Sequence, residues 1–315
     1  MPIEINNGGL VYEPEDNNIE NNELEIEIGQ EEDPGSEAEM LQEGPAGLSQ
    51  QELNDPNSIR VTIADQNTPI VVLYGPPSCG KTMTLVRMTR FLKKQGYTVS
   101  PERIFRPAYD SNYRNLCDNF DQMMNSDNAA EGTKVISFML VKVLKDGKPI
   151  CQILEAPGEY YFNPDDPNRG YPPYINAIIN GRNRKVWSIM VEPDWTDSVP
   201  RANYVTRIAN LKTLMSPKDR TLFVFNKIDL TPYVRGAGQV NTKEAIKYIQ
   251  NLYPGIFAPF KNENPITKIF KEYNCELVPF MTGSYSQTIS GGFMYVEGHE
   301  SYAKKLWQAM LKLIN

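Results

Sequence analysis

The sequence predicts a three-layer α/β domain in which helices cover both faces of a mostly parallel β-sheet. Short apolar runs typical of buried strands alternate along the chain with segments of helical periodicity. The 315 residues are 40% hydrophobic, which is enough to form one sizeable core. A third observation is a glycine-containing loop that lies between one such run and one such segment.

This loop follows the first predicted strand, residues 70–74, which have the sequence IVVLY. The next eight residues, GPPSCGKT, match the P-loop pattern G-x-x-x-x-G-K-[ST], and Leu85, Met88 and Leu92 then recur with helical spacing. Glycines let the backbone wrap closely around phosphate oxygens, and the helix N-terminus adds partial positive charge. We therefore expect the residues of this loop to bind nucleotide phosphates: Gly75, Ser78, Cys79, Gly80, Lys81 and Thr82.

Two side chains of the loop have specific expected roles. Lys81 would contact the β- and γ-phosphates, and the hydroxyl of Thr82 would bind Mg²⁺. Cys79 occupies a variable position of the pattern, where a small filler residue is expected and a redox-sensing role is the alternative.

A second motif indicates which base is bound. Residues 221–225, TLFVF, predict another buried strand, and Asn226, Lys227 and Asp229 follow in the spacing N-K-x-D. Guanine presents two donors on one edge, N1–H and the exocyclic amine, and a carboxylate accepts both as a bidentate pair. Asp229 would therefore select guanine over adenine. The stem of Lys227 can lie over the base, and Asn226 can tie this loop to the P-loop.

With both motifs present, residues 68–315 resemble the Ras-like branch of P-loop GTPases, the TRAFAC class, with its P-loop NTPase fold. The resemblance implies a D-x-x-G segment, and the candidate here is residues 155–158, after a strand at 150–153. Gly158 matches, and its N–H would meet the γ-phosphate. Glu155 replaces the aspartate that reaches Mg²⁺ through water, and Glu159 replaces the glutamine that orients the attacking water.

Two further site elements are implied by the resemblance. Thr133, ahead of a hairpin that turns at Asp146-Gly147, would close over Mg²⁺ and take part in catalysis; an ordinary strand-start residue is the alternative. A short loop after the strand at 277–281 would read guanine O6 through its backbone. The candidate residues for this loop are Thr282, Gly283 and Ser284.

The chain divides into an acidic N-terminal tail, residues 1–60, and a folded domain, residues 61–315. The tail contains 16 acidic residues and one basic residue, whereas the rest of the chain contains 23 acidic and 31 basic residues. With almost no aromatic residues, the tail is predicted to be disordered. It is either a solubility tail or a segment that docks on a partner or on the basic body. The domain carries three expected insertions, at about 97–132, 159–184 and 285–300.

Partners and location follow from the same features. A protein partner is expected at the first two insertions, which fall at the switch loops of the resembled class, and also at the tail. No nucleic-acid partner is predicted. No signal peptide, membrane span or lipidation signal is visible, and four cysteines without metal spacing fit a reducing cytoplasm. The unusual tail and insertions are compatible with a bacterial member of the class.

The sequence therefore predicts a protein that binds GTP and GDP with Mg²⁺, hydrolyses GTP slowly, and acts as a regulated switch or assembly component. Glu159 keeps a second reading open, a GTP-binding scaffold with little turnover, because a carboxylate can only accept hydrogen bonds and brings charge beside the phosphate oxygens. A P-loop ATPase or kinase is the third reading, and Asp229 argues against it.

Overall fold

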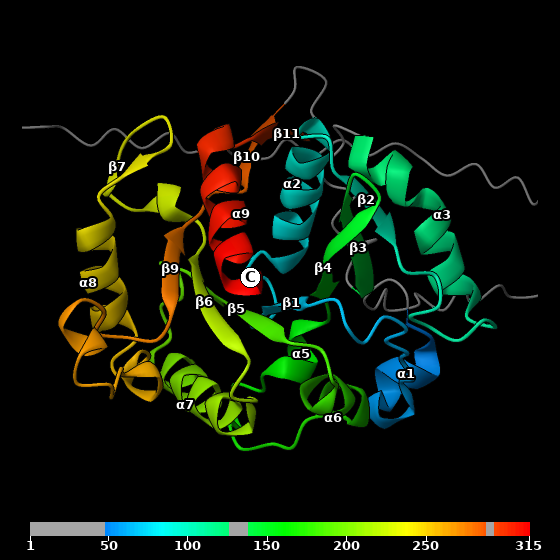
Figure 1. Ribbon diagram of the computed structural model, residues 1–315, viewed down its shortest axis with the longest axis horizontal. Helices are drawn as coiled ribbons and strands as arrows, with labels where there is room; N and C mark the ends of the chain where they lie inside the picture. Colours follow the sequence, from blue (N-terminus) through cyan, green and yellow to red (C-terminus); the bar gives the residue numbers. More distant parts are fainter. Residues whose placement is uncertain (1–47, 126–137, 288–292) are drawn as a thin grey trace, which may run out of the picture. The chain divides into compact units, whose positions relative to one another are not determined.

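The computed structural model describes residues 48–125, 138–287 and 293–315. Within them, a seven-stranded sheet has the order β2-β3-β4-β1-β5-β6-β9 (Figure 1). The strands of this sheet are β1 (Ile70–Tyr74), β2 (Thr98–Pro101), β3 (Met139–Lys145), β4 (Lys148–Glu155), β5 (Lys185–Val191), β6 (Arg220–Phe225) and β9 (Glu276–Pro279).

Most of this sheet is parallel. Strand β1 pairs in parallel with β4 and β5, and β5–β6 and β6–β9 are also parallel pairs. Strands β2, β3 and β4 are joined by antiparallel pairing. The β3–β4 hairpin turns at Asp146 and Gly147, which have φ of 51° and 73°, as expected for an Asp-Gly turn between twisted strands. The predicted mostly parallel sheet is confirmed.

Helices cover both faces of the sheet. Figure 1 shows α2, α3 and α9 on one face and α6 and α7 on the other. The helices are α1 (Gln50–Asn54), α2 (Lys81–Lys94), α3 (Ser111–Asn125), α5 (Gly158–Tyr161), α6 (Pro173–Asn180), α7 (Ser198–Leu214), α8 (Thr242–Leu252) and α9 (Glu300–Ile314).

Burial explains this layering. Every residue of β1 and β5 is buried, as expected for central strands that are covered on both faces. Leu85, Met88 and Leu92 of α2 are buried at the spacing predicted from the sequence. The three-layer α/β fold class is therefore confirmed by the strand order and by the helical layers.

The N-terminal boundary differs from the expectation. Residues 48–60, assigned to the disordered tail, contain α1 and the 3₁₀ helix η1 (Pro56–Ser58), and the side chains of Leu48 and Ile59 are buried. An ion pair of 2.5 Å joins Glu52 to Arg106 of the domain. These contacts make residues 48–60 part of the folded domain, so the boundary at residue 60 is corrected to precede Leu48. Residues 1–47 lie outside the described chain.

The three expected insertions contain regular structure where they are described. The first contains β2 and α3, and the second contains α5 and α6. The third contains the antiparallel hairpin β10 (Gly283–Gln287) and β11 (Phe293–Glu297). Buried Arg87 of α2 donates to the carboxylate of Glu297 at 2.8 Å and thereby anchors this hairpin. None of the helices in the described residues is both long enough and apolar enough to cross a membrane.

Candidate functional site

The P-loop has the geometry that its glycines require. It connects the end of β1 to Lys81, the first residue of α2, and Gly80 has φ of 89°. A Cβ on Gly80 would lie 2.2 Å from Nδ2 of Asn226, and a Cβ on Gly75 would lie 2.6 Å from Sγ of Cys79. Side chains at these two positions would therefore displace neighbouring parts of the site.

Lys81 points its ammonium group back into this loop. Its Nζ donates to the carbonyl oxygens of Gly75 and Pro76 at 3.1 and 2.8 Å, and the residue is buried. These neutral acceptors leave the positive charge of Lys81 uncompensated within the loop. Phosphate oxygens could replace them and form stronger, charge-assisted hydrogen bonds.

Thr82 and Glu155 form a second polar contact beside the loop. Strands β1 and β4 are neighbours with Leu73 opposite Glu155, and Thr82 donates to Oε1 of Glu155 at 3.1 Å. The other carboxylate oxygen, Oε2, is buried without a hydrogen-bond partner. A hydroxyl beside an unsatisfied carboxylate oxygen fits a Mg²⁺ site completed by phosphate oxygens and water. Among the described residues, no group of three or more Asp, Glu, His or Cys side chains could hold a metal alone.

Burial dominates the titration of Glu155. It raises the pKa of this carboxyl to about 8, although Lys81 and the Thr82 hydroxyl act in the opposite direction and Glu159 adds to the rise. Burial also raises the pKa of the Cys79 thiol to about 11, so Cys79 is not a thiolate at neutral pH. This favours the filler role expected for Cys79 over the redox role.

Replacing Glu155 with glutamine should stabilise the ligand-free protein at pH 8 but not at pH 5. The pKa of Glu155 is about 8 in the folded state and about 4.5 in the unfolded state, so the folded protein is most stable while this carboxyl is protonated. That stability is fully present below pH 4.5 and is lost as the pH rises through about 8. The glutamine variant resembles the protonated carboxyl at every pH, so its advantage should grow across this window to a few kcal/mol in order of magnitude. Thermal unfolding at both pH values measures it, with Glu244→Gln on the surface of α8 as the matched control. A difference that is independent of pH would contradict the assignment.

Gly158 brings the end of β4 against the P-loop. A Cβ at this position would lie 2.3 Å from the backbone nitrogen of Pro77 and 2.7 Å from Nζ of Lys81. Gly158 begins α5, which also contains Glu159, and the side chain of Glu159 is exposed. Gly158 therefore lies directly against the P-loop, and Glu159 is the next residue of the chain.

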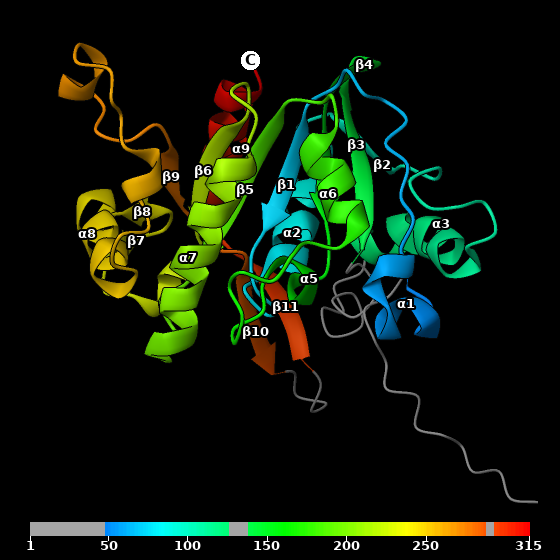
Figure 2. The same cartoon turned by 90° about the horizontal axis from the view of Figure 1, so that it is seen from below.

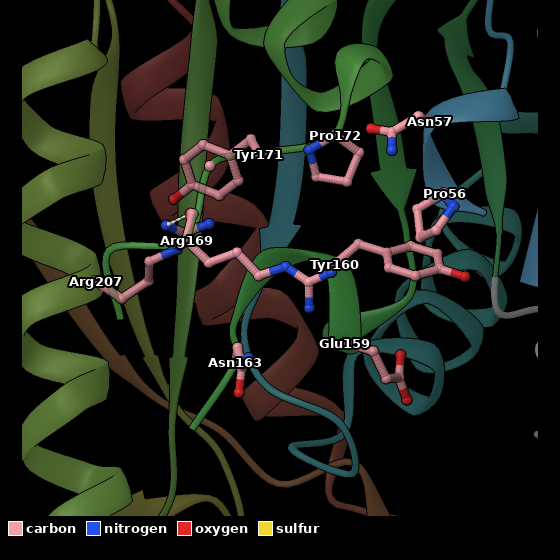
Figure 3. Close-up of a pocket in the computed structure, with 10 residues that line it drawn as sticks. Pro56, Asn57, Glu159, Tyr160, Asn163, Arg169, Tyr171, Pro172 and Arg207 are labelled. Carbon is pink, nitrogen blue, oxygen red and sulfur yellow. Dashed lines mark hydrogen bonds between the residues drawn. The ribbon is translucent and has the colours of Figure 1, made fainter. Parts of the chain in front are cut away.

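Glu159 also lines a polar cavity of about 300 Å³, together with Arg169 and Arg207 (Figure 3). Arg207 is buried and donates to the carbonyl oxygens of Tyr161 and Pro167, so it supports the chain that surrounds the cavity. Figure 3 shows the side chain of exposed Arg169 extending towards Tyr160. Sequence reasoning did not identify this cation near Glu159, because residues 159 and 169 share no motif.

The predicted base-binding motif lies at the carboxyl end of β6. Nδ2 of Asn226 donates to the carbonyl oxygen of Cys79 in the P-loop at 3.0 Å. Lys227 has a left-handed backbone conformation, with φ of 53°, and Asp229 begins an exposed stretch of η2 (Ile228–Leu230). Within the described residues, the carboxylate of Asp229 makes no hydrogen bond or ion pair. It is therefore available to accept donors from a base.

The third predicted element begins a strand instead of forming a free loop. Thr282 follows β9, whereas Gly283 and Ser284 are the first two residues of β10. A Cβ on Gly283 would lie 2.3 Å from the carbonyl oxygen of Val296, so the close pairing of the hairpin requires glycine here. The N–H of Ile228 donates to the carbonyl oxygen of Phe280 at 3.2 Å, which holds this segment beside the Asn226–Asp229 motif. Thr133 lies outside the described residues.

Glu192 and Asp194 are polar residues at this edge that the motifs do not identify. They follow β5, the strand between β1 and β6, and both form ion pairs with Lys227. Their signal in the sequence is weak, because polar residues follow most parallel strands. Only the adjacency of β5 and β6 brings them to the base-binding motif.

Comparison with known proteins gives matches in structure only. No protein-family model matches the chain, and no curated protein matches it. A GTP-binding protein from Plasmodium falciparum matches with 14% identity over 80% of this chain and 90% of its own, with a TM-score of 0.37. The GTPase-like domain of Ski7 from S. cerevisiae, bound to GDP and inorganic phosphate, matches with 13% identity over 78% of this chain and 50% of its own, with a TM-score of 0.38.

A third match is the GDP-bound Roco2 protein of Methanosarcina barkeri, with 15% identity over 81% of this chain and 52% of its own, and a TM-score of 0.32. The chain thus spans about half the length of the Ski7 and Roco2 structures. Because these TM-scores are low, the fold assignment rests on the strand order and the P-loop of the chain itself.

Proposed function

We propose that this protein binds GDP and GTP with Mg²⁺ and hydrolyses GTP slowly, as a regulated switch or assembly component. The observation that carries the proposal is the hydrogen bond from Asn226 to the carbonyl oxygen of Cys79. It joins the predicted phosphate-binding loop to the predicted guanine-binding motif, although 147 positions separate them in the sequence. Two independent motifs thus meet in a single site at the carboxyl edge of the sheet, where ligands bind in open α/β folds.

The phosphates would be bound by the ammonium group of Lys81 and by the backbone N–H groups of residues 78–82. Thr82 and Glu155 would hold Mg²⁺, whose charge would neutralise phosphate oxygens. Lys81 would exchange its contacts with Gly75 and Pro76 for phosphate oxygens. The exposed carboxylate of Asp229 would accept the two donors of guanine, and the backbone of residues 282–284 would face guanine O6.

Switching is proposed to work through the contact of Gly158 with the P-loop. A γ-phosphate that meets the N–H of Gly158 would compete with the close approach of this residue to Pro77. The same movement would reach Tyr160 on α5, whose hydroxyl lies 3.5 Å from the carbonyl oxygen of Glu52 in α1. A protein partner at the second insertion or at the N-terminal segment could therefore distinguish the two nucleotide states.

Slow hydrolysis is expected because Glu159, a carboxylate, stands where enzymes of the resembled class have the glutamine that orients the attacking water. We expect intrinsic turnover on the order of 10⁻⁴ to 10⁻² s⁻¹, the range of unassisted enzymes of this type. If the charge of Glu159 hinders the reaction, Glu159→Gln should be as fast as the wild type or faster; if Glu159 is a general base, the variant should be slower. Phosphate release in a single turnover of GTP measures the hydrolysis rate of each variant, and the same experiment with ATP tests the choice of nucleotide.

Glu263→Gln, an exposed carboxylate on another segment, is the matched control and should leave the rate unchanged. Fast hydrolysis by the wild type, together with a Glu159→Ala variant that behaves identically, would remove Glu159 from the mechanism. Tight GTP binding without any phosphate release would favour the scaffold function instead.

A further inference from the structure

The side chain of Lys227 is held between two carboxylates that belong to a different strand connection. Its Nζ lies 2.6 Å from Oε2 of Glu192 and 2.9 Å from Oδ2 of Asp194. The side chain of Glu192 is 11% exposed and that of Asp194 is 42% exposed, whereas that of Lys227 is 31% exposed. The ammonium group is therefore directed towards the end of β5 instead of into solvent.

The backbone around Lys227 is fixed as well. The N–H of Asn226 donates to the carbonyl oxygen of Val191 at 2.9 Å, and the N–H of Ile228 donates to that of Phe280 at 3.2 Å. Lys227 lies between these two contacts with φ of 53°, a left-handed conformation that is unfavourable for a residue with a Cβ. Such a conformation persists where the surrounding structure determines it, and it is concentrated at functional sites.

Glu192 is itself held in place by Tyr253, the residue that follows α8. The hydroxyl of Tyr253 donates to the carbonyl oxygen of Glu192 at 2.8 Å. A buried carboxylate near bound phosphates would be unfavourable unless a cation compensates it, and Lys227 is that cation. The pair therefore also keeps uncompensated negative charge away from the nucleotide.

We propose that Glu192 and Asp194 are positioning residues for the base: they act through Lys227 and hold its aliphatic stem where it covers one face of guanine. This inference rests on the proposed function. With both ends of the side chain fixed, the stem forms a preformed apolar surface beside the carboxylate of Asp229, and less conformational freedom is lost when the base binds. Without the ion pairs to Glu192 and Asp194, the ammonium group of Lys227 would move into solvent, and its stem would move away from the base.

A double-mutant cycle on GDP affinity tests this inference. Calorimetric titration would compare the wild type, Glu192→Gln, Lys227→Met and the double variant, because methionine keeps an unbranched stem without the charge. Glu192→Gln should weaken GDP binding by about tenfold in the wild-type background. In the Lys227→Met background the same substitution should leave the affinity unchanged or improve it, because no ammonium group remains to be positioned.

Two further variants separate positioning from general stability. Asp194 is half-exposed, so Asp194→Asn should leave the unfolding midpoint unchanged. Like Glu192→Gln, it should weaken GDP binding. Glu244→Gln, which breaks the exposed pair of Glu244 with Lys247, should leave GDP affinity unchanged.

The outcomes distinguish this inference from the proposed function. If the wild type does not bind GDP, both are overturned. If the wild type binds GDP but Glu192→Gln and Asp194→Asn bind it equally well, the inference alone is overturned. An equal loss of affinity on Glu192→Gln in both lysine backgrounds would also overturn it, because Glu192 would then act independently of Lys227.

Discussion

Replacing Lys81 with alanine should reduce the affinity for both GTP and GDP by at least about 100-fold. The buried ammonium group is the cation of the predicted phosphate-binding loop, and charge-assisted hydrogen bonds of this kind contribute about 1.5–3 kcal/mol each. The substitution also leaves the carbonyl oxygens of Gly75 and Pro76 without their donor, so the loop itself should lose order. Calorimetric titration with each nucleotide in the presence of Mg²⁺ measures the loss.

The matched control for this experiment is Lys247→Ala, an exposed lysine of α8 that pairs with Glu244. It should bind both nucleotides as the wild type does. Unchanged GDP affinity in Lys81→Ala, with and without Mg²⁺, would show that the loop does not bind phosphate.

Replacing Asp229 with alanine should sharply weaken the binding of guanine nucleotides and leave the protein folded. Two donors of the bound base would lose their acceptor, at about 1–3 kcal/mol each. Folding should change by less than about 0.5 kcal/mol, because Asp229 is exposed and its carboxylate makes no contact within the described chain that the fold depends on. Binding and stability therefore respond differently, and a titration together with a thermal melt separates them.

Asp118→Ala on α3 is the control, because Asp118 is similarly exposed and pairs with exposed Arg103. If Asp229→Ala retained the GDP affinity of the wild type, the carboxylate of Asp229 would not bind the base. Equal weakening in Asp118→Ala would point to a general effect of removing negative charge.

The parts of the fold that the sequence predicted are those with strong local signals. The run at residues 70–74 forms β1, and Asp146-Gly147 forms the expected hairpin turn. In both cases the pattern is contained within a few neighbouring residues, and the buried sheet selects the same conformation that local propensity favours. The Asn226 contact with Cys79 could also be anticipated, because each motif identifies its own loop.

Other parts were missed because their signals are short or non-local. Ser49 and Glu52 form a capping box that begins α1, a pattern visible in the sequence, but the acidic composition around it dominated the interpretation. Strand β2 ends at Pro101 and only Val99 in it is fully buried, so its pairing with β3 decides its conformation. Thr282 to Ser284 were predicted as a loop, yet pairing with β11 extends Gly283 into a strand.

The contacts of Lys227 show what remained outside the reach of sequence reasoning. Glu192 lies 35 positions before it, and no motif connects the two residues. Only the parallel pairing of β5 with β6, which places Val191 opposite Phe225, brings the carboxylate to the ammonium group. Each motif identifies its own candidate site residues, whereas the contacts of Lys227 with Glu192 and Asp194 depend on the assembled sheet.

A paired titration shows whether the P-loop and the Asn226–Asp229 motif form one guanine-nucleotide site. The wild-type protein would be titrated by calorimetry with GDP and with ADP, both with Mg²⁺. We expect one site for GDP and an affinity for ADP that is at least about 100-fold weaker, because a site built for hydrogen-bond donors rejects a base that lacks them. Equal affinities for GDP and ADP, or no binding of either nucleotide, would contradict it.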